Sequence, residues 1–229
     1  MIWLILIVFP ALIVVIGVLV SRRRTRRIRM GAMNLATALG FERLEGKEAV
    51  RRLIPANAPP FAMEDYEKMP GPLRRLLESS LAAYCIAGTV DGARITIFLE
   101  SRGGGKSQTR YTVVRADYPK PLPFELGIAY EDTFTRLGKA LFGLRDVETG
   151  DEAFDRAVRI KAGDEVSAKL MLGNPETKAA ILGLFALSRA AFATSTHVQW
   201  ERQGARFDPS EVRTVIAALV PVTRTLGNG

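Results

Sequence analysis

The stretch that decides the fold reads Ala82-Ala-Tyr-Cys-Ile-Ala-Gly-Thr-Val90, then Asp91-Gly92, then Ala93-Arg-Ile-Thr-Ile-Phe-Leu-Glu100. The first run is rich in strand-forming residues, and the last alternates so that Ile95 and Ile97 share a face. An Asp-Gly pair between two such runs is typical of a two-residue type I′ turn, because both positions take a positive φ. The stretch therefore predicts an antiparallel hairpin.

Two further strands are predicted downstream of this hairpin. A glycine-rich loop, Arg102–Gln108, leads to a third strand at Thr109–Ala116, and a fourth follows at Phe124–Tyr130 after a proline-rich connection. The sum is an antiparallel meander of four strands in chain order. Such a sheet buries one face only if helices cover it, so we expect an α+β fold.

The candidate helices share apolar spacing with capping or stopping residues. They lie at Met30–Phe41, Lys47–Leu53, Asp132–Gly143, Asp164–Leu172, Pro175–Leu187 and from Asp208 onward, with a break expected near Pro221. Short strands are expected at Ala157–Lys161 and in a final hairpin, Thr196–Glu201 with Ala205–Phe207, around Gln203-Gly204.

An uncharged apolar run, Ile2–Val20, opens the chain. As a helix its 19 residues would span about 28 Å, close to the thickness of a bilayer. No basic residue precedes it and arginines stand where a signal peptide would be cleaved, so a retained transmembrane helix is predicted. The arginines that follow favour the cytoplasmic side, with the N-terminus outside, and are predicted to contact anionic lipid headgroups. They are Arg22, Arg23, Arg24, Arg26, Arg27 and Arg29.

The charge of the chain is concentrated in this cluster. The formal net charge is +8, and without the six arginines 26 basic residues face 24 acidic ones. A nucleic-acid-binding domain would carry its positive charge on the folded part, so binding of nucleic acid is not expected. Arginine and alanine are abundant, as in bacterial proteins encoded by G+C-rich genes.

Three segments follow from these patterns. Residues 1–29 form the transmembrane anchor with its polybasic edge, residues 30–80 a helical and proline-rich connector, and residues 81–229 the α+β domain. Pro55–Pro72 is either a linker or a loop that wraps the domain. The predicted fold class is α+β, with a single N-terminal transmembrane helix followed by a cytoplasmic domain whose antiparallel sheet is covered by helices. The predicted location is the bacterial inner membrane.

The loop Gly103-Gly-Gly-Lys-Ser107 resembles part of a phosphate-binding loop but lacks its first glycine, whose position holds Glu100. A strand, not a helix, is predicted after it, so we interpret it as a mobile hairpin loop. Its cations, with those beside it, could contact an acidic partner or lipid headgroups. They are Arg102, Lys106 and Arg110.

Few residues suit catalysis. Cys85 and His197 are the sole cysteine and histidine, so any thiol or imidazole chemistry would need this pair, and metal sites built on such residues are excluded by count. No cofactor is predicted. Five carboxylates cluster without the spacing of a calcium loop and are interpreted as caps of a solvated turn. They are Asp146, Glu148, Asp151, Glu152 and Asp155.

The segment Thr149-Gly-Asp-Glu-Ala-Phe-Asp155, the alternating Val158-Arg-Ile160 and Ala162-Gly-Asp-Glu165 resemble a family of uncharacterised, membrane-associated bacterial proteins. The resemblance covers about Ile95 to Leu187. It implies a membrane-linked domain and supplies no catalytic residues. On physical grounds we expect Phe154 to fill the core, with Asp151 and Asp155 fixing a structural turn.

Two hypotheses of function follow. In the first, the cytoplasmic α+β domain binds a partner protein, as part of an envelope assembly, or lipid headgroups. In the second, the protein is a membrane-tethered hydrolase that uses Cys85 and His197 or the carboxylates between Glu148 and Asp155. The distance between these groups discriminates between the two.

Overall fold

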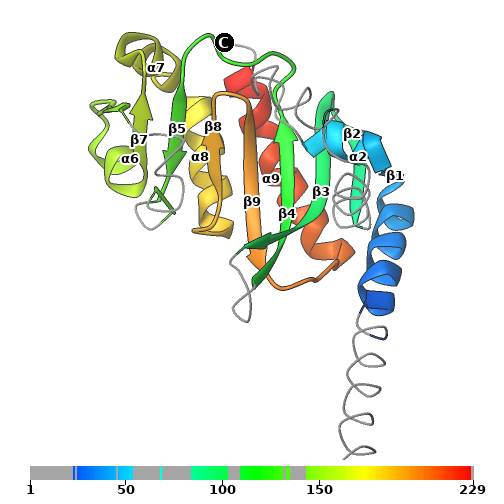
Figure 1. Cartoon of the computed structure of the whole chain (residues 1–229). Helices are drawn as coiled ribbons and strands as arrows, with labels where there is room; N and C mark the ends of the chain where they lie inside the picture. The colour runs from blue at the N-terminus through cyan, green and yellow to red at the C-terminus, as the bar shows by residue number, and fades with distance from the viewer. Residues whose placement is uncertain are drawn as a thin grey trace, which may run out of the picture.

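The structure is a computed structural model and describes residues 23, 25–44, 46–53, 68, 84–102, 109–130, 133–134 and 143–227. Its architecture is a single broad sheet with helices on its faces (Figure 1). The strands are β1 (Glu42–Leu44), β2 (Cys85–Val90), β3 (Ala93–Arg102), β4 (Thr109–Asp117), β5 (Leu126–Ala129), β6 (Arg145–Asp146), β7 (Arg159–Ala162), β8 (Phe192–Thr194) and β9 (His197–Gln203). The helices are one at residues 25–39, α2 (Gly46–Leu53), α6 (Glu152–Ala157), α7 (Glu165–Leu172), α8 (Pro175–Leu187) and α9 (Pro209–Gly227).

The hairpin prediction is confirmed. β2 and β3 pair antiparallel with Val90 opposite Ala93, and the turn residues Asp91 and Gly92 have φ of 48° and 80°. Positive φ at both positions is what a type I′ turn needs, and Gly92 takes it without a Cβ penalty. β4 pairs antiparallel with β3 as expected, so β2, β3 and β4 form a meander.

The predicted position of the fourth strand of the meander is wrong. Among the described residues, the strand order is β1-β2-β3-β4-β9-β8-β5-β7-β6, so β9 and β8 lie between β4 and β5. The final hairpin was also predicted wrongly, because β9 pairs with β8 and with β4, not with residues 205–207. Gly204, with φ of 100°, ends β9 and the chain turns into α9.

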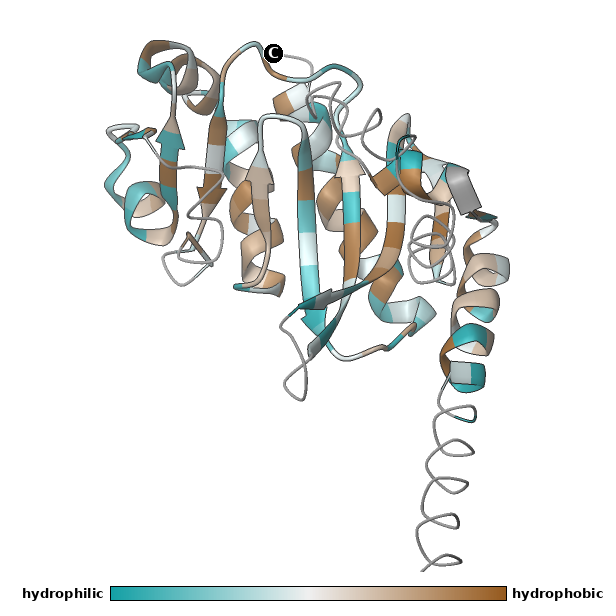
Figure 2. Cartoon of the chain, in the orientation of Figure 1, coloured by the Kyte–Doolittle hydropathy of each residue, from teal (hydrophilic) through white to brown (hydrophobic). Residues whose placement is uncertain are grey.

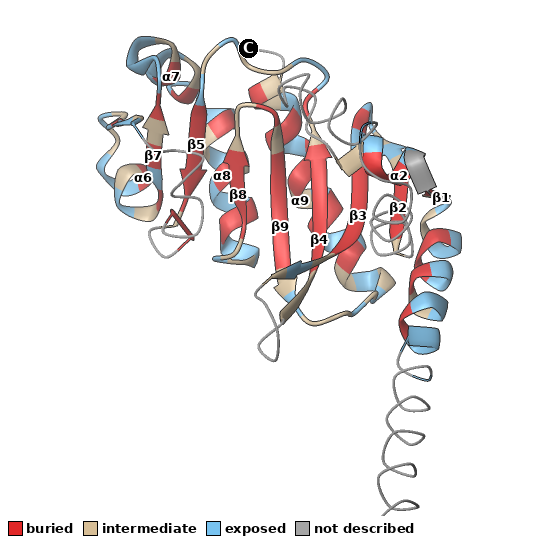
Figure 3. Cartoon of the chain, viewed as in Figure 1, coloured by how far each residue is buried: buried red, intermediate tan, exposed pale blue. Residues whose placement is uncertain are grey.

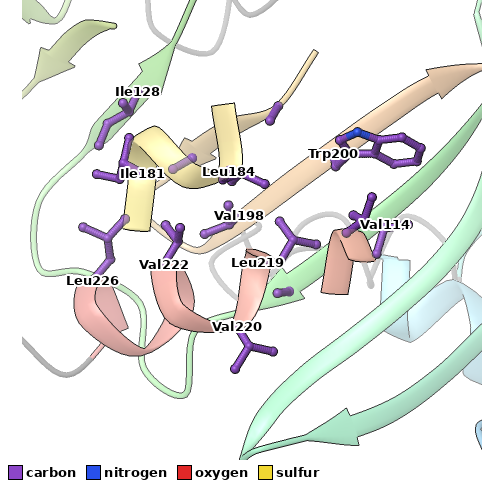
Figure 4. Close-up of a cluster of buried hydrophobic side chains, with 14 of the residues drawn as sticks. Val114, Ile128, Ile181, Leu184, Val198, Trp200, Leu219, Val220, Val222 and Leu226 are labelled. Carbon is purple, nitrogen blue, oxygen red and sulfur yellow. The ribbon is translucent and has the colours of Figure 1, made fainter. Parts of the chain in front are cut away.

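The main core lies between the sheet and the pair α8 and α9 (Figure 4). Alternation along the central strands directs Ile95, Ile97, Val114 and Val198 to this side, where they meet the apolar face of α9. Figure 2 shows hydrophobic residues along β3, β4 and β5 and on α8 and α9, whereas much of β9 is hydrophilic. The expectation of an antiparallel sheet covered by helices is thus confirmed.

On the opposite face of the sheet, α2 packs over β2, β3 and β4 (Figures 1 and 3). A smaller apolar cluster lies there, including Ala49 of α2 with Cys85 and Val113 of the sheet. Since both faces are covered, the middle of β4 is buried on both sides, which includes the charged Arg115. Residues 25–53, predicted as part of the anchor and connector, contribute a helix, an edge strand and α2 to this body.

α9 continues through Pro221, where a break was predicted. Proline removes one amide donor, which leaves the carbonyl of Ala217 without its helical partner. Ala217 and Pro221 are both exposed, so water can satisfy that carbonyl and the helix runs on to Gly227.

The predicted fold class needs one correction. It placed a transmembrane helix before the α+β domain, but in the part of the chain that the structure describes no helix is long and apolar enough to cross a membrane. Ile2–Val20, for which that helix was predicted, lies outside the described residues. The first helix that is described, residues 25–39, has one buried apolar side and one exposed side that carries most of its polar residues, which is the pattern of a helix packed on a domain. The α+β architecture is what remains of the prediction.

Candidate functional site

The exposed side of helix 25–39 combines cations with large apolar side chains. Arg26, Arg27 and Arg29 are exposed, as are Met30 at 49% and Met33 at 42%. Arg23, also helical, is exposed, whereas Arg22 and Arg24 lie outside the described residues. We call the set Arg23, Arg26, Arg27, Arg29, Met30 and Met33 the basic face. Residues three, four and seven apart share one side of a helix, so Met30 lies among Arg23, Arg26 and Arg27.

The other side of the same helix packs against the domain. Ile28, Ala32 and Leu35 are buried, and Gly31 packs where a Cβ would lie 3.5 Å from the ring of Phe207. Figure 3 shows this buried side turned toward the sheet and the exposed side turned away. The helix therefore displays the basic face from a fixed position on the domain.

The chain leaves this helix through a tight turn. Gly40, with φ of 67°, follows the last helical residue, which suits a glycine without a side chain. Phe41 then lies flat on Gly88 of β2, so close that a Cβ at Gly88 would be 2.2 Å from the ring. This contact connects the end of the helix directly to the sheet.

The cations beside the glycine-rich loop are placed differently. Arg102 donates to Glu201 at 2.7 Å, pairs with Glu100 and lies 4.7 Å over the Tyr111 ring. The hydrogen bonds that Arg102 donates to Glu201 and Glu100 hold the Arg102 pKa above its usual range. Arg102 is thus engaged by the protein itself. Arg110 lies on β4 opposite Ser101, and Lys106 lies outside the described residues, so the loop remains a predicted contact surface.

Cys85 and His197 are not brought together. Cys85 lies on β2. Following the strand registers straight across β3 and β4, the residue of β9 that lies level with Cys85 is Glu201. His197 is four residues from Glu201 along β9. Three strand spacings and four residues of rise amount to a separation of about 19 Å. A thiolate and its base need hydrogen-bond contact, so this pair cannot act as a nucleophile and base.

Each of the two groups is also held in its ordinary, uncharged form: the Cys85 thiol is buried, and His197 is half-buried. Burial raises the pKa of the Cys85 thiol to about 12. Burial, with the positive charge of Arg115, lowers the pKa of His197 to about 3. The His197 Nδ1 lies 2.8 Å from the Thr196 hydroxyl and 3.2 Å from the Thr194 hydroxyl. These contacts describe a structural histidine.

The depressed pKa of His197 predicts an acid-dependent loss of stability. Below about pH 6.5 His197 is protonated in the unfolded chain, whereas in the folded protein it is protonated only near pH 3. Because the unfolded chain binds the extra proton, the free energy of unfolding falls as pH falls through this window. The contribution at pH 5 is about 2 kcal/mol relative to pH 8. Urea unfolding of the wild type and of His197→Asn between pH 8 and 4 measures it. If both proteins lose stability with the same slope, His197 is not the cause.

The carboxylates of residues 146–155 build a turn. Asp155 accepts hydrogen bonds from the Thr149 amide and hydroxyl and from the Gly150 amide, at 2.8–3.0 Å. Asp151 caps α6 by accepting from the Phe154 amide, and it pairs with Lys178 at 2.9 Å, which lowers the Asp151 pKa. Asp146 pairs with Arg159 of β7.

No group of three or more potential metal ligands occurs within the described ranges.

Phe154 is 1% exposed and lies in the main core. The carboxylates of this turn that make contacts act on the backbone and on neighbouring cations.

Sequence patterns did not single out Arg115, which is 4% exposed. Its guanidinium donates to the carbonyls of Arg52 and Leu53 at the end of α2, and its Nε lies 2.9 Å from an Asp117 oxygen. Strand alternation does place it on the same face as Tyr111 and Val113. Nothing local in the sequence says that α2 covers that face.

No protein-family profile matches the chain, and no curated protein matches it. Among solved structures, the crystal structure of the mycobacterial trehalose monomycolate transport factor A, TtfA, aligns with a TM-score of 0.48 and 7% sequence identity, over 88% of this chain and 95% of that one. A likeness at this level establishes neither a shared family nor a shared function. The resemblance at residues 149–155 stays an observation on the sequence.

Proposed function

We propose that this protein is a binding module that works at an anionic membrane surface, on the cytoplasmic face of the bacterial cell membrane, through the basic face. The observation that supports this is the alternation of exposed arginines with Met30 and Met33 on a helix whose other side is fixed to the domain. Arginines bind lipid phosphates, and exposed methionines suit the boundary between headgroups and acyl chains.

The size of the effect follows from the number of charges. A basic side chain near an anionic bilayer contributes about 1 kcal/mol. The four described arginines of the basic face would then contribute about 4 kcal/mol, roughly a thousandfold in affinity for vesicles. This attraction is screened by salt, since it acts over about a Debye length.

A probe on the basic face tests the proposal directly. An environment-sensitive fluorophore is attached to the full chain at Met30→Cys. Cys85 is buried with its pKa raised to about 12, so it does not compete for the label. We expect a blue shift with vesicles of phosphatidylcholine containing 30% phosphatidylglycerol, and none with phosphatidylcholine alone. The control label is Gly183→Cys, on the exposed side of α8, where an added Cβ meets nothing within 4 Å.

Charge variants complete the experiment. Arg23, Arg26, Arg27 and Arg29 changed together to Gln should abolish the blue shift at Met30→Cys. The same number of exposed arginines removed elsewhere should leave the blue shift intact. The matched set is Arg145, Arg156, Arg206 and Arg224. Each of three outcomes would refute the proposal. They are an equal blue shift with the two lipid compositions, an equal blue shift for the labels at positions 30 and 183, and an equal loss of the blue shift in the two charge variants.

A further inference from the structure

A cavity of about 800 Å³ lies between α2 and the face of the sheet that α2 covers. Its lining includes Arg51 and Arg52 of α2, Arg94 of β3, Arg115 of β4, and Asp117 with Tyr118 at the end of β4. The volume is in the range of pockets that hold small ligands. It is separate from the basic face, none of whose residues lines it.

The positive charges of this cavity are only partly compensated. Arg115 is occupied by Asp117 and by the two carbonyls at the end of α2. Arg94 reaches Asp117 only at 4.0 Å and is 47% exposed. Among the described residues Arg51 has no ion pair, and the other two carboxylates of the lining, Glu42 and Glu48, are both exposed at the rim.

Among the lining arginines, Arg52 has a buried Nε without a hydrogen-bond partner within the described part of the chain, whereas the Nε of Arg115 lies 2.9 Å from an Asp117 oxygen. Burial and the positive charges of Arg94 and Arg115 hold the Arg52 pKa below its usual range. Buried donors are normally satisfied, and an anion in the cavity would satisfy the Arg52 donor and reduce the repulsion between the arginines.

We propose that this cavity binds the phosphate group of a small ligand, with Arg51, Arg52 and Arg94 as the binding cations. A guanidinium presents paired N–H donors that match the oxygens of a phosphate, and several oxygens on one tetrahedral group can accept from arginines on two different elements. A soluble phosphate ester and a lipid headgroup share this chemistry, and the experiment separates them.

The first arm uses soluble probes. Inorganic phosphate and glycerol 3-phosphate are titrated into the full-length protein by calorimetry, with chloride at matched ionic strength as the blank. We expect both to bind, and Arg51→Gln with Arg94→Gln to raise the Kd about tenfold or more. The side chains of Arg51 and Arg94 are both exposed, so the double variant should fold. Arg206→Gln with Arg224→Gln removes the same charge from exposed positions outside the cavity and should change the Kd less than about twofold.

The second arm measures the affinity of the full-length protein, with its basic face intact, for phosphatidylglycerol vesicles. If soluble probes do not bind but the Arg51 and Arg94 changes weaken vesicle binding more than the Arg206 and Arg224 changes do, the phosphate is that of a lipid headgroup. The proposal is overturned if the cavity variant matches wild type in both arms, or if the two double variants lose phosphate binding equally. The soluble arm contains no membrane, so it fails or succeeds independently of the function proposed for the basic face.

Discussion

Replacing Phe154 by alanine is expected to lower the free energy of unfolding by about 3–5 kcal/mol. The side chain is 1% exposed and belongs to the main core, where α6 meets β7 and α8. Lys178 of α8 lies 5.6 Å over its ring while binding Asp151, so the ring also supports the turn that caps α6. Truncation would leave a cavity that this tightly connected site cannot close.

Urea unfolding at neutral pH measures the loss, as a lower midpoint with an unchanged slope. Leu187→Ala is the surface control, because Leu187 is 47% exposed, and its change should stay within about 0.5 kcal/mol. Phe154→Leu should fall between the two because it keeps most of the apolar volume. A loss below about 1 kcal/mol in Phe154→Ala would contradict the role of this ring as a core residue.

Arg115→Met is the second change with a large expected effect, also about 3–5 kcal/mol. The variant would leave Asp117, which is 16% exposed in its side chain, without its closest cation, and the last carbonyls of α2 without their donor. Arg115 also lies 5.9 Å over the Phe98 ring, so apolar packing of the stem is retained in methionine while the charge is lost.

The distinguishing measurement is hydrogen exchange of the α2 amides. If Arg115 holds α2 against the sheet, these amides should lose protection in Arg115→Met by more than the β3 amides do. Arg94→Met is the matched control, since Arg94 reaches the same carboxylate at 4.0 Å but is 47% exposed, and it should cost less than about 1 kcal/mol. Equal stability losses in the two variants would show that burial does not increase the contribution of Arg115 to the free energy of unfolding.

Much of the local structure could be predicted because its causes are local. Asp164 accepts from the amides of Val166 and Ser167, and Asn174 accepts from that of Glu176, so both cap the helices that were expected to start after them. Asp208 does the same for α9. A cap and the amides it binds lie within three residues, so their spacing is visible in the sequence.

Pairings between distant segments were not predictable in the same way. The patterns of β5 and β9 identify strands, but alternation says only which side chains share a face, not which strand is the neighbour. The insertion of β9 and β8 between β4 and β5 depends on α8 and α9 packing against one side of the sheet. The short edge strand β1 was missed because three residues carry too little pattern.

By itself the sequence determined the hairpin at Asp91-Gly92, the helix caps, the α+β class and the concentration of positive charge before residue 30. These depend on residues that are close in the chain, or on composition. Only the tertiary structure decided the strand order, the 19 Å or so between Cys85 and His197, and the gathering of Arg51, Arg52 and Arg94 around one cavity. Those features depend on which surfaces bury each other, and burial is a property of the whole chain.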